Sequence, residues 1–428
     1  MYSIAGYLML LAGTGRLGGP AARRRGGRVP GACPDEGFAW LRTGDGQWSG
    51  PCHAPGPGHA PGHAPGPGHA PGPCHAPSPC HAPGPCTPAA ARMPNRIRYV
   101  AAMAKRTPDV FVLGAGVIGL SCALALLKSG LKVTVYCADS PFQSTSSAAG
   151  ALWGVHLVGE DERIGPWAAA TLDHFRRMMA EPTTGVREVA GLQAFFDDQP
   201  EPPEMAGGLP GLAKADQATL PAGYTAGWRY LAPVIAMPVY LGYLVSQVIS
   251  HGGMVHVDEP LRSLEHTAER TSAPVIVNCT GIGARELVPD DAMVPVRGQV
   301  LVVVNPGISE FFVGERSEPE RITYFFPHGG TVLLGGTEQP GNADTRPDEA
   351  IASAIRSACA AIDPRLAKAR VLDHRVGLRP LRPAVRLEAQ PLPGGRHVVH
   401  NYGHGGSGVT LSWGCAQAVS SLVAELLA

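Results

Sequence analysis

Two glycine-rich segments, far apart in the 428-residue sequence, have the composition of a cofactor-binding helix start. Residues 114–119 are Gly-Ala-Gly-Val-Ile-Gly, and residues 405–410 are Gly-Gly-Ser-Gly-Val-Thr. Glycine lets the backbone approach a flat ligand closely, and the free N–H groups of a helix start form a positive end. Two such helix starts in one domain predict one long cofactor held at both ends. The candidate cofactor-binding residues here are Gly114, Ala115, Gly116, Val117, Ile118, Gly119, Gly405, Gly406, Ser407, Gly408, Val409 and Thr410.

The first glycine segment stands between a predicted strand and a predicted helix. The apolar run 109–113 is typical of a buried parallel strand, 117–129 has apolar residues on one helical face, and 132–137 is a second strand. This is the context that a Gly-x-Gly-x-x-Gly match requires in a dinucleotide-binding fold. The acid expected to bind the ribose comes slightly late, at Asp139, so either Asp139 or backbone groups hold it.

Small and hydroxyl residues follow the second strand, from Ser144 to Gly154. They suit a loop wrapped on pyrophosphate or ribityl oxygens, and a helix N-cap is an alternative that does not exclude that role. A further glycine, Gly281, follows the predicted strand 275–279 and is expected to return the chain to the cofactor. The remaining candidate cofactor-binding residues are Asp139, Thr145, Ser146, Ala149, Gly150, Leu152 and Gly281.

The N-terminal region, residues 1–106, differs in composition from the rest of the chain. Residues 51–88 repeat short Gly, Pro, Ala, His and Cys units without large apolar residues, which cannot offset the entropy of ordering. We predict a disordered or non-native extension that is dispensable, with Met93 or Met103 as the true start. Its Cys and His residues follow the proline repeat, so no metal site is predicted. Its apolar start is too short to span a bilayer.

Beyond residue 154 the pattern is that of an α+β region. Strands outside the strand–helix–strand unit are expected to form a second sheet over the cofactor. A hairpin is expected around Pro327-His328-Gly329-Gly330. The predicted strands are 186–196, 254–257, 275–279 and 300–304, and the predicted helices are 238–250, 348–361 and 411–427.

Several segments of residues 109–427 together resemble the D-amino-acid oxidase family, which includes D-aspartate oxidase. The last two motifs in chain order are quite specific to that family, whereas the first is common to many flavoproteins. The N-terminal region has no counterpart in it. The matching segments are 112–121, 148–153, 275–281, Arg297-Gly298-Gln299, Gly377-Leu378-Arg379-Pro380-Leu381-Arg382-Pro383 and 400–410.

The resemblance implies an α/β fold with FAD as the cofactor. A Rossmann-like FAD-binding domain, formed by about 107–155, 272–300 and 372–428, would carry an interleaved α+β substrate domain. That substrate domain, about 156–271 and 301–371, would roof the flavin. Residues 107–428 together would form the oxidoreductase, and residues 1–106 the extension.

The resemblance also implies a reaction and three catalytic residues. A D-amino acid would be deaminated by hydride transfer to flavin N5, and O2 would reoxidise the flavin, giving a 2-oxo acid, ammonia and hydrogen peroxide. Arg379, whose planar fork matches a carboxylate, aligns with the carboxylate-binding arginine of the family. Tyr324 aligns with the carboxylate-binding tyrosine, and the Gly406 carbonyl with the group that accepts from the amine.

Substrate choice is expected to depend on the loop from Phe311 to Arg321. Animal members carry a second tyrosine where this chain has Glu320, so a tyrosine lid is in doubt. If Phe311 and Phe312 face the pocket, neutral D-amino acids fit best. If Arg316 or Arg321 faces it, D-aspartate or D-glutamate does. Acids slightly outnumber arginines in this loop, including Glu315 and Glu318, so we predict neutral substrates.

Other functions remain open alternatives. They are a D-aspartate or D-glutamate oxidase, a glycine- or sarcosine-type amine oxidase, and an inactive flavin-binding protein. The formal net charge is zero at pH 7, and the core has neither a basic stripe nor a twenty-residue apolar run. We therefore expect a D-amino acid and O2 as partners, without nucleic acid or membrane. The expected location is cytoplasmic, and a homodimer is one possibility for the oligomeric state.

Overall fold

The structure, a computed structural model, describes residues 107–199, 201–314 and 321–428. The prediction for residues 1–106 lies outside this described part. So do the predictions that concern Glu315, Arg316, Glu318 and Glu320, and the side chain of Arg321.

The strands of the described part join in one 14-stranded sheet, with the order β4-β5-β3-β9-β10-β11-β8-β13-β14-β7-β1-β2-β6 and β12 paired to β8. The strands are β1 (Val110–Leu113), β2 (Val133–Cys137), β3 (Val186–Phe195), β4 (Ala213–Lys214), β5 (Ala226–Ile235), β6 (Met254–Val257), β7 (Val275–Asn278), β8 (Val294–Val304), β9 (Phe311–Gly314), β10 (Arg321–Pro327), β11 (Thr331–Thr337), β12 (Gln339–Pro340), β13 (Val371–Leu392) and β14 (Arg396–His404). The helices are α3 (Val117–Lys128), α4 (Thr145–Ala148), α5 (Ile164–Met178), α6 (Met237–Ser250), α7 (Leu264–Arg270), α8 (Ala284–Leu287), α9 (Glu349–Ile362) and α10 (Gly408–Leu427).

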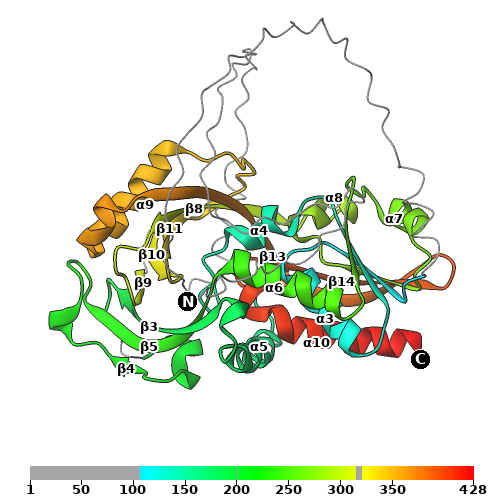
Figure 1. Cartoon of the computed structure of the whole chain (residues 1–428), viewed down its shortest axis with the longest axis horizontal. Helices are drawn as coiled ribbons and strands as arrows, with labels where there is room; N and C mark the ends of the chain where they lie inside the picture. The colour runs from blue at the N-terminus through cyan, green and yellow to red at the C-terminus, as the bar shows by residue number, and fades with distance from the viewer. Residues whose placement is uncertain (1–106, 200, 315–320) are drawn as a thin grey trace, which may run out of the picture. The chain divides into compact units, whose positions relative to one another are not determined.

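One end of the sheet is parallel, in the order β14-β7-β1-β2-β6. β1, β2 and β7 are buried along their whole length, as continuous apolar runs in parallel sheets usually are. Helix α3 packs on β1 and β2, and α10, red in Figure 1, runs beside α3 and α5. The predicted strand–helix–strand unit at 109–137 is confirmed.

The other end of the sheet is mainly antiparallel and carries α9 on one face. β9, β10, β11 and β8 follow one another antiparallel, and β10 and β11 form the hairpin predicted around 327–330. Helix α9 packs over β8, β10 and β11, and the Asp348 carboxylate caps its start by accepting from the Ala350 and Ile351 N–H groups.

The two ends are continuous because β13 belongs to both. This strand of 22 residues pairs antiparallel with β14 on one side and with β8 on the other. The prediction of a separate second sheet is therefore wrong, because β13 joins the parallel and the antiparallel strands in one sheet. The expected boundaries also change, because β6 pairs in parallel with β2 and α6 packs on α3. Residues 237–257 thus lie with the parallel strands and not with the substrate part.

The turn between β1 and α3 brings backbone into unusually close contact. Gly114 has φ +97°, and a Cβ there would collide with the Cys279 carbonyl oxygen after β7. A Cβ at Gly119 would collide with the Gly114 carbonyl oxygen. Only glycine at both positions lets α3 begin directly against the ends of β1 and β7.

Helix α10 begins earlier than the sequence pattern suggests, at Gly408 instead of Leu411. Its first i−4 hydrogen bond runs from the Leu411 N–H to the Ser407 carbonyl at 3.0 Å. The residues before Leu411, from Gly408 to Thr410, therefore belong to its first turn. None of the helices in the described residues is long and apolar enough to cross a bilayer. The described cysteines are all buried and unpaired: Cys122, Cys137, Cys279, Cys359 and Cys415.

We predict that Gly119→Ala destabilises the protein and weakens FAD retention. The added methyl must push α3 away from the Gly114 carbonyl, and such overpacking typically costs about 1–3 kcal/mol. Gly165→Ala in α5 is the matched control, because nothing lies within 4 Å of its Cβ and helices prefer alanine. Thermal unfolding and the flavin content of the purified proteins measure both effects. Equal behaviour of the two variants would contradict this account of the turn.

Candidate functional site

A cavity of about 1210 Å³ opens where the parallel and antiparallel ends of the sheet meet. Both glycine-rich helix starts line it, and a Cβ at Gly408 would lie 4.0 Å from Ile118 Cγ1. The predicted residues that line it are Gly114, Ala115, Gly116, Val117, Ile118, Asp139, Thr145, Ser146, Ala149, Gly150, Leu152, Gly281, Tyr324, Arg379, Gly405, Gly406, Gly408, Val409 and Thr410. Gly119 and Ser407 lie behind the wall and shape it.

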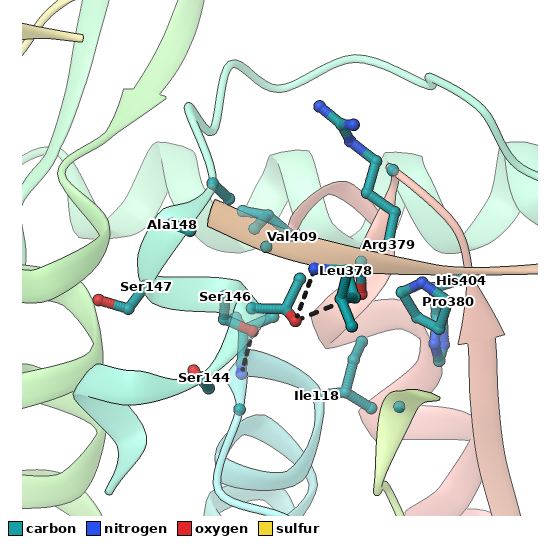
Figure 2. A pocket seen from close by; sticks show the side chains of 18 of the residues that line it. Ile118, Ser144, Ser146, Ser147, Ala148, Leu378, Arg379, Pro380, His404 and Val409 are labelled. Carbon is teal, nitrogen blue, oxygen red and sulfur yellow. Dashed lines mark hydrogen bonds between the residues drawn. The ribbon is translucent and has the colours of Figure 1, made fainter. Parts of the chain in front are cut away.

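Hydroxyl groups of α4 tie the first helix start to β13 (Figure 2). The Val117 N–H donates to Ser146 Oγ at 3.0 Å. Thr145 Oγ1 donates to the Leu378 carbonyl at 3.3 Å and lies 3.4 Å from the Leu378 nitrogen. Ser144 stands at the N-cap position of α4, but its hydroxyl donates to the Pro141 carbonyl and caps nothing. The hydroxyl cluster therefore shapes the cavity rim, whereas the side-chain N-cap considered from the sequence is absent at Ser144.

The second helix start is held by its own backbone and hydroxyls. The Gly405 N–H donates to the Pro380 carbonyl at 2.8 Å, and the Gly406 N–H donates to the Leu157 carbonyl at 2.9 Å. These two N–H groups already have protein acceptors. The N–H groups of Gly408, Val409 and Thr410 precede the first i−4 bond, so they form the positive end that the sequence suggested.

Two hydroxyls at this helix start clamp the segment that follows β-bridge residue Leu152. Ser407 Oγ accepts from the His156 N–H at 2.8 Å and donates to the His156 carbonyl at 2.8 Å. Thr410 Oγ1 accepts from the Gly154 N–H at 3.2 Å and donates to the Gly154 carbonyl at 2.8 Å. Ser407 is fully buried, so its contribution is to fix residues 154–156 against the cavity.

Buried polar atoms at the cavity wall lack partners among the described residues. His404 Nε2 and Asn401 Oδ1 are both buried without a hydrogen bond, and both residues line the cavity. Burial lowers the pKa of His404 to about 3, so the ring is neutral. Unsatisfied buried groups are costly in a native protein, which indicates a polar ligand here. The cavity exceeds the roughly 300–1,000 Å³ of ordinary small-molecule sites, and FAD with a substrate fits its size and donors.

Arg379 and Tyr324 come together at one wall of this cavity. Arg379 Nη1 donates to the Thr337 carbonyl at 2.9 Å, and its guanidinium lies against Gly298, where a Cβ would collide with it. Tyr324 is 7% exposed and packs its ring on Gly335 and Gly336. Burial raises the pKa of Tyr324, against the opposing charge of Arg379. The phenol therefore stays protonated as a donor beside a fixed cation.

The Arg297-Gly298-Gln299 segment explains how that wall is built. Arg297 is 2% exposed and donates to the Asp344 and Arg346 carbonyls, both at 2.7 Å. Gln299 Oε1 accepts from the Asp348 N–H at 2.9 Å. These two side chains bind the chain that leads into α9, while the glycine between them makes room for Arg379. The sequence identified this segment but not its task.

The structure adds an ion pair that the sequence did not reveal. His156 Nε2 pairs with Glu338 Oε1, although 182 positions separate them. His156 lines the cavity, and Glu338 lies just behind it with 8% exposure. Burial pushes the pKa of Glu338 upward, but the paired His156 and nearby Arg379 outweigh it and keep that pKa below its usual value. The sequence pattern around either residue gave no signal of this pair.

The loop expected to control specificity is only partly described. Phe311 and Phe312 do not line the cavity, because Phe311 packs against Tyr230 and Phe312 against Tyr224 and Phe325. Val313 of β9 and Ile322 of β10 line it instead. Val313 and Ile322 make this part of the wall apolar, so the case in which Phe311 and Phe312 face the pocket does not hold.

Comparison with known proteins places the chain among flavin-dependent enzymes. The family described as FAD dependent oxidoreductase matches residues 109–422. A D-amino-acid oxidase from Rubrobacter xylanophilus is 45% identical over 74% of this chain and 96% of its own length. The D-amino-acid oxidase of Streptomyces coelicolor is 44% identical over 74% of this chain and 97% of its own length. Human D-aspartate oxidase is 33% identical over 74% of this chain and 95% of its own length. A glycine oxidase structure from Bacillus cereus shares the fold, with a TM-score of 0.61, 19% identity and coverage of 74% and 95%.

The fold and the cavity are thus those of an oxidoreductase whose cofactor is FAD. The chain belongs to the FAD-dependent oxidoreductase family that contains the D-amino-acid oxidases.

We predict that Ser407→Ala loosens the 154–156 segment and lowers stability. Removing the hydroxyl leaves the partly buried N–H and carbonyl of His156 without their partner, at a cost of about 1–3 kcal/mol. Ser420→Ala in the same helix is the control, because its hydroxyl pairs with Ser129 at an exposed site. Thermal unfolding and the Kd for FAD are the measurements. A Ser407→Ala protein as stable as the control would show that the clamp is unimportant.

Proposed function

We propose that this protein catalyses FAD-dependent oxidative deamination of D-amino acids. The overall reaction converts a D-amino acid, water and O2 to a 2-oxo acid, ammonia and hydrogen peroxide. The observation that carries the proposal is the pairing of Arg379 with Tyr324 on the wall that also holds the Gly405–Gly406 turn. Relatives named D-amino-acid oxidase at 44–45% identity support it.

The carboxylate of the substrate binds to Arg379 and Tyr324. The guanidinium presents a planar fork that matches a carboxylate in two parallel hydrogen bonds, and the phenol donates a third. Contact with Gly298 and the bond to Thr337 restrict the side chain of Arg379 before substrate arrives. This preorganisation lowers the entropic cost of orienting the substrate.

The amine of the substrate binds to the carbonyl of Gly406. Because the Gly405 N–H donates to Pro380, the residue after Arg379, the amine and carboxylate sites share one rigid unit. The substrate carboxylate and amine are then both fixed, and the substrate side chain points to Val313 and Ile322. These three constraints leave one orientation of the α-carbon. That orientation selects one enantiomer, which we assign as D.

FAD, when bound, supplies the two-electron acceptor for the α-carbon. The Gly114–Gly119 turn and the start of α3 would hold its pyrophosphate, as helix starts commonly do. Asp139, at the end of β2, or neighbouring backbone would hold the ribose. Thr145, Ser146, Ala149, Gly150, Leu152 and Gly281 would line its path. The start of α10 at Gly408–Thr410 would place a positive dipole end beside the flavin ring.

We also propose that neutral substrates are preferred, that the activity resides in residues 107–428, and that the enzyme acts in the cytoplasm. The described wall near Tyr324 is apolar at Val313 and Ile322, which supports the first point. The relatives cover 74% of this chain, which supports the second.

Replacing Arg379 tests the substrate orientation. We predict that Arg379→Leu lowers kcat/KM for D-amino acids by at least about 30-fold, because truncating a buried charge partner costs about 2–5 kcal/mol. Arg379→Lys keeps the charge but loses the fork, so it should recover only part of that loss. Arg356→Leu on α9, whose guanidinium donates to the Ala367 carbonyl at an exposed site, is the control. Flavin absorbance verifies folding, and near-normal kcat/KM in Arg379→Leu would refute the orientation.

Substrate preference is tested by comparing kcat/KM for D-methionine and D-aspartate at one pH. We predict that D-methionine is preferred, because Val313 and Ile322 are apolar and the Glu338 carboxylate lies nearby. Glycine and sarcosine in the same assay test the amine-oxidase alternative. A D-aspartate preference that disappears in Arg316→Ala or Arg321→Ala would reverse the conclusion and identify the residue responsible.

A further inference from the structure

A buried carboxylate lies close to the arginine that the substrate needs. Glu338 is 8% exposed and directly follows Thr337, whose carbonyl accepts from Arg379 Nη1 at 2.9 Å. The Glu338 carboxylate raises the pKa of the Tyr324 hydroxyl. The Arg379 guanidinium in turn lowers the pKa of the Glu338 carboxyl. An anion thus lies directly behind the wall that receives the substrate carboxylate.

Such an anion needs a cation, because burying an unpaired carboxylate is very costly. Two possible partners lie close to it, the His156 imidazole and the Arg379 guanidinium. The structure pairs Glu338 with His156, while Arg379 forms no ion pair with any carboxylate among residues 107–199, 201–314 and 321–428. An arginine–carboxylate pair would be the stronger contact, since it can be bidentate. The observed choice therefore depends on His156 being held in place.

His156 is held from two sides. Ser407 fixes its backbone through two hydrogen bonds of 2.8 Å. Its ring lies against Gly406, where a Cβ would stand 3.0 Å from Cδ2, and its Nε2 faces Glu338. The imidazole, whose side chain is 44% exposed, thus contacts both the turn that receives the substrate amine and the carboxylate behind the wall.

We propose that His156 is a positioning residue that keeps Glu338 away from Arg379 and so leaves the guanidinium available for the substrate carboxylate. This inference rests on the proposed function, because it assumes that Arg379 binds the substrate. Without His156, Glu338 turns to Arg379 and competes with every carboxylate ligand. The pair thus acts through Arg379 and takes no part in the chemical step.

The test compares His156→Ala, Glu338→Gln and the double variant. We measure KM and kcat for a D-amino acid, and the Kd of the matching 2-oxo acid from the change in flavin absorbance. His156→Ala should raise both KM and Kd at least about tenfold, with kcat at saturation little changed; tenfold corresponds to about 1.4 kcal/mol. Adding Glu338→Gln should restore both, because the amide no longer competes for Arg379. Glu310→Gln, which removes an exposed pair with Arg229, is the control.

The single Glu338→Gln variant provides an independent arm if His156→Ala does not fold. It should bind the 2-oxo acid as tightly as the wild type or more tightly. A merely structural pair predicts the reverse, with Glu338→Gln weakening binding and the double variant as poor as His156→Ala; either result, or an unchanged Kd in His156→Ala, would overturn the proposal. A wild-type enzyme that neither oxidises D-amino acids nor binds 2-oxo acids would reject the proposed function itself, and this inference with it.

Discussion

The structure depends on one long strand that belongs to two differently built parts of the sheet. β13 hydrogen-bonds to β14, at the edge of the parallel strands, and to β8, at the edge of the antiparallel ones. Because neighbouring side chains of a strand alternate between faces, Leu378 and Arg379 point in opposite directions. The backbone of Leu378 meets Thr145 at the cofactor rim, while Arg379 reaches the substrate wall. The register of one strand therefore sets the distance between the two halves of the site.

Local patterns in the sequence predicted the parts of the fold that short segments determine. The apolar run before Gly114, the glycine spacing and the helix after it need only their own neighbours, and the structure confirms them. The resemblance supplied Arg379 and Tyr324, and both line the cavity. The sequence pattern predicted the start of α10 three residues too late. Glycine is a poor helix former, and the pattern does not include the packing that stabilises this turn.

Features that depend on long-range contacts could not be predicted. The His156–Glu338 pair joins residues from opposite parts of the sequence, and nothing around either residue marks it. The continuity of the sheet depends on β13 having partners on both edges, which periodicity within one strand cannot show. The sequence left open whether Phe311 and Phe312 face the pocket, because the direction of these side chains depends on distant aromatic partners. In the structure an aromatic cluster with Tyr230, Tyr224 and Phe325 takes them instead.

The burial of four cysteines in the described part of the chain, Cys137, Cys279, Cys359 and Cys415, affects how the enzyme tolerates the oxidant that it produces. Under the proposed reaction, every turnover releases an oxidant inside the protein. Peroxide attacks the thiolate form of cysteine and leaves the thiol largely untouched. Burial raises the pKa of Cys137 and of Cys359 to about 12, and raises those of Cys279 and Cys415 well above their usual value. These thiols stay protonated at neutral pH. The packing that forms the core therefore also protects its cysteines from oxidation by the hydrogen peroxide that the reaction releases.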